Sequence, residues 1–364
     1  MPLGKFGSFM NDFYKDKKIL ITGHTGFKGT WLCLYLLKLK AKIYGLSLPP
    51  EENSLYRKVE VFLKANIDEY FINILDSKSL SGAVETIEPD LIFHLAAQPL
   101  VRKSYIDPIE TWQTNLLGSL NILNCLKSYK KKCAVVVITT DKVYLNKEWE
   151  FGYRENDILG GNDPYSASKA ALEIAISSWR CSFCGSDNHQ NKNIFIATAR
   201  AGNVIGGGDM AQDRIVPDCI RALICKNKIA VRNPKSTRPW QHVLEPLNGY
   251  LKLGMELYCN PKMMSTSFNF GPYVTNNTTV EKLVRQILFH WPGVYEISKN
   301  HKNYHESNLL HLQIDKVHKY LNWYPKWDFE ITVEKTINWY KKVFNGSSPL
   351  EMCNLDIDSY ENKI

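Results

Sequence analysis

A short apolar strand followed at once by three evenly spaced glycines is the feature that most constrains the fold of this chain. Residues 18–22 read KILIT, and Gly23, Gly26 and Gly29 follow before a helix that runs through Trp31 to about residue 40. Glycines let a backbone turn tightly and approach an anionic group, and a helix N-terminus offers free N–H groups. In this strand–turn–helix context the Gly-x-x-Gly-x-x-Gly spacing predicts a dinucleotide-binding turn.

Later segments repeat the alternation of strand and helix. Strands are expected at 41–46, 91–94, 134–138 and 193–197, and helices at 108–129 and 165–182. Short, continuously apolar strands between helices indicate a parallel sheet that is covered on both faces. We therefore expect an α/β chain with a Rossmann-type, doubly wound parallel sheet.

The pattern changes after Arg200, where short elements follow in less regular order with several prolines. We expect residues 1–205 to form the dinucleotide-binding Rossmann domain, with later segments free to interleave with it. Residues 206–346 are expected to form a smaller, C-terminal substrate-binding lobe. Residues 347–364 follow a GSSP linker and read as an acidic tail without a core, which we expect to be mobile.

The composition narrows the class of protein. The 364 residues are 44% hydrophobic and 23% charged, and no apolar run approaches the ~20 residues that span a bilayer. Residues 1–18 lack the apolar stretch of a signal peptide, and the nine cysteines do not have the spacing of a secreted disulfide framework. We expect a cytoplasmic protein without a membrane partner.

A net charge of +8 allows a nucleic-acid partner but does not require one, because the basic residues are dispersed. The densest run, KKK at 130–132, reads as a solvated helix end, and an anionic small substrate explains a basic cleft equally well. Cys181, Cys184 and His189 resemble half of a zinc site, but no second ligand pair stands at a usual spacing. We expect neither nucleic-acid binding nor a metal.

Two segments carry the residues expected to do chemistry. Segment 139–142 reads TTDK at the end of a predicted strand, and segment 165–169 reads YSASK at the start of a predicted helix. Tyr165 and Lys169 share one helix face, so the charge of Lys169 can lower the pKa of the phenol. With Thr140 holding the same hydroxyl, Tyr165 can take a proton from a sugar hydroxyl while a hydride leaves for a nicotinamide.

Asp141 and Lys142 fit a second step, the elimination of water. A protonated Asp141 can act as the acid, and an uncharged Lys142 as the base. Burial and neighbouring positive charges favour the uncharged state of an amine. The alternative for this pair is a structural salt bridge at the end of the strand.

The end of the second predicted strand bears on which nicotinamide cofactor is used. An acid there binds the ribose hydroxyls of NAD, whereas an arginine accepts the extra phosphate of NADP. Segment 45–50 reads GLSLPP and has neither, which leaves Ser47 as the candidate for the ribose. Because no cation is nearby, we expect NAD.

Over about residues 18–344 the chain resembles the extended short-chain dehydrogenase/reductase family, and within it the CDP-glucose 4,6-dehydratases. The segments that carry this resemblance are TGHTGFKG (22–29), HLAAQPLVR (94–102), TTDK (139–142), LGGNDPYS (159–166), RAGNVIGGGD (200–209) and RPWQHVLEPL (238–247). The glycines occur across the wider family, whereas the Asp–Lys pair and RPWQH are much narrower. In the related dTDP-glucose dehydratases a Glu takes the place of Lys142.

Carried over residue by residue, the resemblance implies a set of binding residues. The cofactor-binding residues are Gly23, Thr25, Gly26, Phe27, Gly29, Ser47, Asn73, Ile74, Ala96, Ala97, Gln98, Tyr165 and Lys169. Arg238 is expected to bind the substrate diphosphate, because a guanidinium binds phosphate bidentately. Asn203, Arg214 and Arg232 are further candidates, each of which could instead make an ordinary salt bridge or loop bond.

The resemblance also implies a reaction, the internal redox dehydration of CDP-glucose to CDP-4-keto-6-deoxyglucose for deoxysugar biosynthesis. Tyr165 serves oxidation at C4, Lys142 takes the C5 proton, and Asp141 protonates the C6 hydroxyl as it leaves. The hydride then returns to C6, so NAD is not consumed. Asn115 is expected to support this site, and His94 and His242 to be structural.

Three positions depart from the family pattern. Asn73 stands where the family has an Asp at the adenine, Met210 replaces a Trp after GGGD, and Val143 replaces a common Cys after the Asp–Lys pair. The amide oxygen of Asn73 can still accept from the adenine amino group, so we expect weaker or altered cofactor binding rather than its loss. None of the three changes removes a catalytic group.

Other functions fit parts of the sequence. Another nucleotide-sugar 4,6-dehydratase, or a 4-epimerase or reductase of the same family, would share the fold, but an epimerase needs no acid–base pair at 141 and 142. A catalytically silent dinucleotide-binding protein would not need Thr140, Tyr165 and Lys169. The family pairs two long helices from each subunit, which implies a homodimer through 108–129 and 165–182, or a homotetramer as a dimer of dimers.

Overall fold

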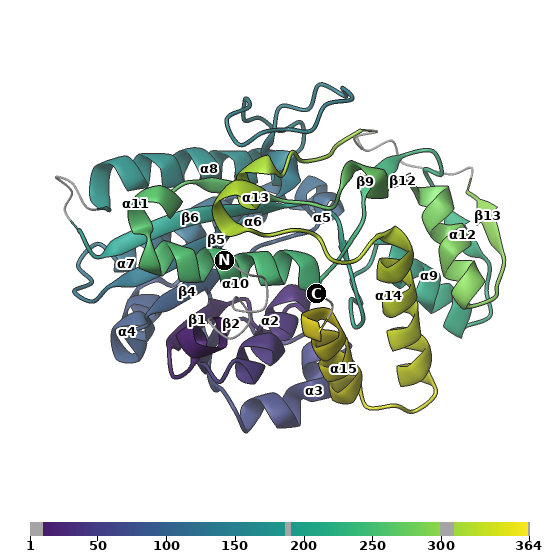
Figure 1. Cartoon of the computed structure of the whole chain (residues 1–364), viewed down its shortest axis with the longest axis horizontal. Helices are drawn as coiled ribbons and strands as arrows, with labels where there is room; N and C mark the ends of the chain where they lie inside the picture. The colour runs from purple at the N-terminus through teal and green to yellow at the C-terminus, as the bar shows by residue number, and fades with distance from the viewer. Residues whose placement is uncertain (1–9, 186–190, 299–308, 363–364) are drawn as a thin grey trace.

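The computed structural model describes residues 10–185, 191–298 and 309–362, and within these ranges its centre is a seven-stranded parallel sheet (Figure 1). The strand order is β11-β6-β5-β4-β1-β2-β3. Strands β2 and β3 are added on one side of β1, whereas β4 and the later strands are added on its other side, so the order of the strands reverses at β1 and β4. The strands are β1 (Lys18–Thr22), β2 (Lys42–Ser47), β3 (Asp68–Phe71), β4 (Leu91–His94), β5 (Cys133–Ile138), β6 (Ile194–Ala201) and β11 (Ser267–Phe270). The expected Rossmann-type, doubly wound sheet is confirmed.

Helices cover both faces of this sheet. They are α2 (Phe27–Lys38), α3 (Leu55–Lys64), α4 (Ser77–Ile87), α5 (Val101–Ile106), α6 (Pro108–Trp112), α7 (Ser119–Cys125), α8 (Pro164–Phe183) and α10 (Leu244–Cys259). Successive residues of a strand point to opposite faces. Ile19 and Ile21 therefore join a core with α2, α3 and α10, whereas Leu20 joins a second core with α4, α7 and α8.

The single helix expected over 108–129 is wrong in its continuity and its end. Between α6 and α7 the chain forms a π-helical segment, η1 (Gln113–Gly118), and α7 ends at Cys125. A π-helical segment widens one turn and turns a side chain out of the regular helical register. Gly118 in this segment makes room for Ile74, whose Cδ1 would lie 2.6 Å from an added Cβ.

The chain beyond β6 builds the lobe at the right of Figure 1 and also returns to the sheet. The strands of this part pair as β7 (Val204–Ile205) with β10 (Gln241–His242), β8 (Ile229–Val231) with β13 (Tyr295–Ile297), and β9 (Thr237–Pro239) with β12 (Asn277–Thr279). The helices are α9 (Ile215–Ile224), α11 (Pro261–Met264), α12 (Val280–His290), α13 (Asp315–Leu321) and α14 (Phe329–Phe344). Strand β11 belongs to the sheet, because it pairs with β6. Helix α10 packs against strands β5 and β6 of the same sheet.

The C-terminal segment differs from the tail without a core that the sequence suggested for 347–364. Residues Pro349–Asn362 form helix α15, which packs against α2, α3 and α14. Met352, Ile357 and Tyr360 are buried, and the Tyr360 hydroxyl donates to Glu245 Oε2 at 2.7 Å. A buried apolar face and a buried hydrogen bond hold this helix in place.

No helix in the described ranges combines the length and the apolar character that crossing a membrane requires.

Candidate active site

The carboxyl end of β5 carries the acid of the site. After β5 the chain enters a short 3-10 turn, η2 (Asp141–Val143), which Thr140 caps by accepting from the Lys142 backbone N–H at 3.3 Å. The Thr140 hydroxyl also donates to Asp141 Oδ1 at 3.0 Å. The TTDK segment is therefore a fixed turn at the end of a strand, which is where parallel sheets place ligands.

Asp141 is buried, with 2% of its surface exposed. Burial raises the pKa of its carboxyl, although Lys142, the Thr140 hydrogen bond and Arg238 act in the opposite direction. Its Oδ2 atom has no hydrogen-bond partner within the described part of the chain. The carboxyl therefore suits an acid that keeps its proton and can donate it from Oδ2. Gly202 leaves room for this group, because an added Cβ would lie 2.8 Å from Oδ2.

Lys142, the neighbour of this buried acid, lines an open pocket. The pocket encloses about 320 Å³ of empty space. Its lining consists of Lys142, Tyr144, Asn146, Gly161, Asn162, Asp163, Ser166 and Leu310. Asp141 and Lys142 thus have different surroundings: the carboxyl of Asp141 is buried, whereas Lys142 borders an open pocket.

The first turn of α8 places Tyr165 beside this strand end. Asp163 caps the helix by accepting from the Ser166 N–H at 2.9 Å, and Pro164 takes the first helical position. Burial raises the pKa of Tyr165 to about 12, while a hydrogen bond with Thr140 lowers it. The structure therefore brings Tyr165 and Thr140 together, as the sequence predicted.

Arg214, expected at the substrate, also acts on the phenol of Tyr165. The positive charge that lowers the pKa of Tyr165 comes chiefly from Arg214. Lys169 lies one turn along α8, is 4% exposed, and donates to the Ile138 carbonyl at 3.3 Å. Burial lowers the pKa of Lys169 itself to about 8, so its ammonium form is less favoured than that of a surface lysine.

The glycine turn has the shape that a diphosphate requires. Gly23 has a φ of 76°, and a Cβ there would lie 2.8 Å from the Ala96 backbone N. A Cβ on Gly29 would lie 2.1 Å from the Gly23 carbonyl oxygen. Gly26 takes the N-cap position of α2 without any side-chain cap, which leaves first-turn N–H groups for an anion. The residues of the turn therefore fit a dinucleotide.

Other predicted cofactor residues line the same edge of the sheet. The Thr25 and Ser47 hydroxyls lie 3.0 Å apart after β1 and β2. Phe27 packs toward the 206–209 loop, since its Cζ would touch a Cβ on Gly206 at 3.3 Å. Asn73 is exposed, and its Oδ1 accepts from the Leu75 N–H at 3.0 Å, so one lone pair of the predicted adenine contact is already engaged.

The segment after β4 is fixed by the π-helical turn. The Ala96 N–H donates to Thr22 Oγ1 at 3.2 Å, and Ala97 and Gln98 follow. Asn115 accepts from the Gln98 N–H at 2.8 Å and donates to Ser168 Oγ at 3.0 Å. One amide in η1 thus ties the segment after β4 to α8, in agreement with the supporting role expected of Asn115.

The four predicted substrate residues divide into two groups. Arg238 and Arg214 lie close enough to the catalytic residues to act on the pKa values of Asp141 and Tyr165, respectively. Asn203 lies in the loop between β6 and β7, where its carbonyl oxygen accepts from the Gln241 N–H at 3.3 Å. Arg232 instead pairs with Asp213 at 2.8 Å and is not among the groups that act most on Asp141 or Tyr165.

Lys28 is a residue of the site that sequence reasoning did not single out. It stands in the first turn of α2, directly before Gly29. Burial and the charge of Arg214 lower its pKa to about 8, while Asp141 and Asp209 raise it. Its position between Gly26 and Gly29 is visible in the sequence. Its burial near Arg214 and Asp141 depends on long-range contacts, which no local pattern reports.

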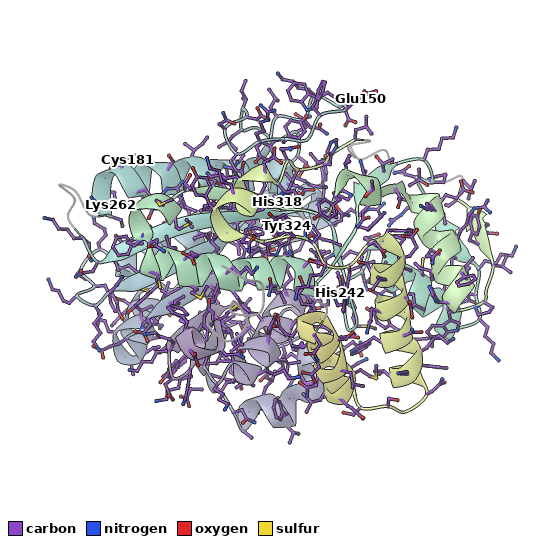
Figure 2. All side chains as sticks on the ribbon, viewed as in Figure 1. Glu150, Cys181, His242, Lys262, His318 and Tyr324 are labelled. Carbon is purple, nitrogen blue, oxygen red and sulfur yellow. The ribbon has the colours of Figure 1, made fainter. Side chains whose placement is uncertain are left out.

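The residues expected to be structural are so placed. His94 bonds Thr22 and Ser119 within the core, and His242 packs against Trp327, with ring centroids 4.8 Å apart. Cys181 lies near the far end of α8 and is exposed (Figure 2), and Cys184 is buried, whereas His189 lies outside the described residues. The described residues hold no cluster of three or more His, Cys, Asp or Glu that could bind a metal.

Comparison with known proteins gives nucleotide-sugar dehydratases and epimerases as relatives. The family model described as GDP-mannose 4,6 dehydratase matches residues 20–336. The CDP-glucose 4,6-dehydratase of Salmonella typhimurium is 39% identical over 96% of this chain and 97% of its own. The dTDP-D-glucose 4,6-dehydratase of Dictyostelium discoideum is 26% identical over 95% of this chain and 85% of its own.

A solved structure agrees in fold. The dTDP-glucose 4,6-dehydratase of Streptomyces venezuelae, solved with NAD bound, superposes with a TM-score of 0.76 at 18% identity, over 91% of this chain and 99% of that one. The family match spans both the glycine turn and the TTDK and YSASK segments. The chain belongs to the nucleotide-sugar 4,6-dehydratase family of extended short-chain dehydrogenases/reductases.

Proposed function

We propose that this protein is a lyase that converts CDP-glucose to CDP-4-keto-6-deoxyglucose with NAD as its cofactor. The observation that carries the proposal is the catalytic turn itself. A buried Asp141 with a raised pKa and a free Oδ2 stands beside Lys142 and within reach of Thr140 and Tyr165. An epimerase has no use for such an acid and amine.

The first step is a proton transfer at C4. Tyr165, in its ionised form, takes the proton of the C4 hydroxyl, and Thr140 holds the same oxygen through its side-chain hydroxyl. The bound nicotinamide supplies the chemistry that no side chain here can supply, accepting the hydride of C4 and returning it at C6. Arg214 favours the ionised phenol by its charge.

The second step removes water across C5 and C6. The new C4 ketone makes the C5 proton acidic, and Lys142 takes that proton. Asp141 protonates the C6 hydroxyl, which leaves as water. Lys142 gives its proton back to C5 in the product. Tyr165 releases its proton to solvent, and Asp141 takes one proton from solvent, so both groups return to their starting states. One water is lost, and the sugar is neither oxidised nor reduced overall.

The residues of the glycine turn support NAD as the cofactor. Gly23, Gly26 and Gly29 leave room for a diphosphate against the first turn of α2. The end of β2 carries Ser47 rather than an arginine that would accept the extra phosphate of NADP. Lys28, in the same turn of α2, adds a positive charge close to where the diphosphate would lie.

The choice of CDP-glucose rests on the relatives and on Lys142. The relative named as a CDP-glucose dehydratase is 39% identical, against 26% for a dTDP-D-glucose dehydratase. The test is to incubate the protein with NAD and, separately, CDP-, dTDP-, UDP- and GDP-glucose, and to follow the loss of one water by mass spectrometry. We expect CDP-glucose to react fastest. Comparable turnover of another nucleotide sugar would overturn the CDP assignment, and net accumulation of NADH would overturn the internal redox mechanism.

We also propose a homodimer through the face formed by α6, η1, α7 and α8. Ile109, Leu117 and Ile174 stand exposed there, with 64%, 51% and 60% of their surface accessible. Exposed apolar side chains that gather on adjacent helices are typical of a protein interface. We expect Ile174→Glu to give a monomer in sedimentation at micromolar concentration, and Ile297→Glu, on β13, to leave the mass unchanged. A monomeric mass for the unmodified protein would refute the dimer.

A further inference from the structure

A buried ion pair lies directly behind the catalytic turn, and the proposed mechanism makes no use of it. Arg200 Nη2 lies 2.8 Å from Glu173 Oε2, and the two side chains are 3% and 1% exposed. A buried pair of this kind pays a large desolvation cost, so it adds little to stability unless its remaining hydrogen bonds are made. Here most of them are made, two by residues close to the catalytic turn, Thr139 and Tyr144, whereas Arg200 Nε has no partner within the described residues.

Glu173 holds the N-terminal side of the catalytic turn. Its Oε1 accepts from the Thr139 hydroxyl at 2.6 Å, and Thr139 directly precedes Thr140. Its Oε2 accepts from the Thr198 hydroxyl at 2.8 Å, on the neighbouring strand β6. Glu173 is also one helical turn beyond Lys169 on α8. A single carboxylate therefore joins the end of β5, the strand β6 and the helix of the Tyr–Lys pair.

Arg200 holds the other side of the turn. Its Nη1 donates to the Tyr144 hydroxyl at 2.8 Å, and Tyr144 follows Lys142 by two residues. The Tyr144 hydroxyl in turn donates to Asn269 Oδ1 at 2.7 Å, on strand β11. The pocket that Lys142 lines is also lined by Tyr144.

The ionic state of the pair is well defined. Burial would raise the pKa of Glu173, but Arg200 and the hydrogen bonds from Arg200, Thr139 and Thr198 outweigh it and leave the pKa lowered. The same negative charge opposes the lowering of the pKa of Lys169 by burial. The carboxylate thus acts on α8 by charge and on β5 by a hydrogen bond.

We propose that Glu173 and Arg200 are positioning residues that grip the segment 140–142 at both ends and hold it in register with Tyr165 and Lys169. The proposal rests on the proposed function for its kinetic consequences and on the geometry alone for its structural ones. Oxidation uses Tyr165 on α8 together with Thr140 on the turn, and elimination uses Asp141 and Lys142 on the turn. A misplacement of one against the other slows the overall reaction without removing a catalytic group.

Two threonines offer a matched pair for the test. Thr139→Val and Thr198→Val each replace one buried hydroxyl that donates to the same carboxylate by a methyl group of similar size. Only Thr139 adjoins the catalytic turn. We expect Thr139→Val to lower kcat about tenfold with little change in KM, which is the size expected for one hydrogen bond to a charged group. Thr198→Val should stay within about twofold of the unmodified protein.

A second measurement does not depend on catalysis. Amide hydrogen exchange of the peptide that covers 140–145 should become faster in Thr139→Val and stay unchanged in Thr198→Val. Failure of the unmodified protein to dehydrate any nucleotide sugar would overturn the proposed function, while this exchange difference would still decide the positioning role. Equal effects of the two variants on exchange, whether both large or both absent, would overturn the positioning role.

Tyr144→Phe tests the other end of the turn. It removes the hydroxyl that accepts from Arg200, and we expect slower elimination relative to oxidation, seen as a rise of bound reduced nicotinamide during turnover. Tyr153→Phe is its control, because Tyr153 stacks on Tyr144 but its hydroxyl bonds Asn146 and the Lys147 N–H instead. The same rise in both variants would show a general disturbance of the pocket and would overturn the role of Arg200.

Discussion

The two sides of the proposed active site are built in different ways. On the catalytic side, at the end of β5 and the start of α8, Asp141 and Lys169 are no more than 4% exposed. On the substrate side, Arg214 and Arg232 are 36% and 27% exposed and are paired with aspartates. Buried groups are held in one geometry, whereas half-exposed ion pairs are weak and easily exchanged.

This difference in burial corresponds to a difference in role between the catalytic residues and the arginines expected to bind the substrate. The catalytic groups must already stand in place, because positioning them during the reaction would cost free energy. Arg214 can leave Asp209 for a diphosphate, since a guanidinium can exchange one anion for another. Variants on the first side should therefore change kcat, and variants on the second side should change KM.

Tyr165→Phe should have the largest effect, on the oxidation step. The variant keeps the ring in place but removes the group that takes the C4 proton, and loss of such a group typically costs ~10² to 10⁴ in rate. No absorbance of enzyme-bound reduced nicotinamide should appear after stopped-flow mixing with CDP-glucose. Its appearance at the normal rate would assign the base to another residue.

Lys142→Ala should have an effect of similar size but on the elimination step. This variant keeps Tyr165 and Thr140, so C4 is oxidised and bound reduced nicotinamide accumulates on adding substrate. Exchange of the C5 hydrogen with deuterated solvent should be lost in parallel, with ~10² to 10⁴ in rate as the expected cost. Normal C5 exchange would mean that Lys142 only provides charge and that a different group is the base.

Arg238 and Arg232 give the next largest contrast, within the substrate side. Arg238 acts on the pKa of Asp141, whereas Arg232 pairs with Asp213. We expect Arg238→Gln to raise KM for CDP-glucose about tenfold or more, as for loss of a charge-assisted hydrogen bond. Arg232→Gln should change KM by no more than about threefold, because exposed ion pairs contribute little. The reverse order in steady-state kinetics would place the diphosphate near Arg232.

The same two sides show what the sequence could predict. Strands β1 and β4 match the predicted ranges, because continuous apolar runs between glycines and helices leave little choice of structure. Tyr165 and Lys169 could be found because their spacing is local, four residues on one helix. Thr140 followed from its place at the end of a predicted strand.

Long-range contacts could not be found in this way. Glu173 and Arg200 are 27 residues apart in sequence and meet only because β6 lies beside β5 and under α8. No local period reports such a pairing. Helix α15 is a different case, since Met352, Cys353, Asp356, Ile357 and Tyr360 have the spacing of one buried helix face. The acidic residues between them obscured that pattern.

Lys28 lies where the two sides meet, and it gives the smallest of the expected effects. Its pKa is lowered to about 8 by burial and by Arg214, while Asp141 from the catalytic side and Asp209 from the substrate side raise it. A diphosphate that binds nearby favours the ammonium form and raises the pKa. Near pH 8 the free protein holds about half a proton on a group with a pKa near 8, so binding should take up a fraction of a proton.

The sign of this linkage sets the pH range of the measurement. Well below pH 8 Lys28 is charged both before and after binding, and well above it the group is uncharged in both states. Because binding raises the pKa, proton uptake should be largest between pH 8 and the raised pKa of the bound protein, and should fade on either side of this range. Calorimetry of CDP binding in buffers of different ionisation enthalpy measures this uptake. Lys169, whose pKa is also lowered to about 8, should contribute part of it.

Lys28→Met isolates the share of Lys28, because it keeps the length of the side chain and removes the charge. On binding CDP at pH 8, this variant should take up fewer protons than the unmodified protein. At pH 6 the proton uptake of the two proteins should differ little. Lys78→Met, an exposed lysine in α4, is the matched control and should behave as the unmodified protein. Equal uptake in Lys28→Met and Lys78→Met would place the diphosphate of CDP away from Lys28. The substrate side would then bind its anion through the arginines alone, and the two sides would share no charged group.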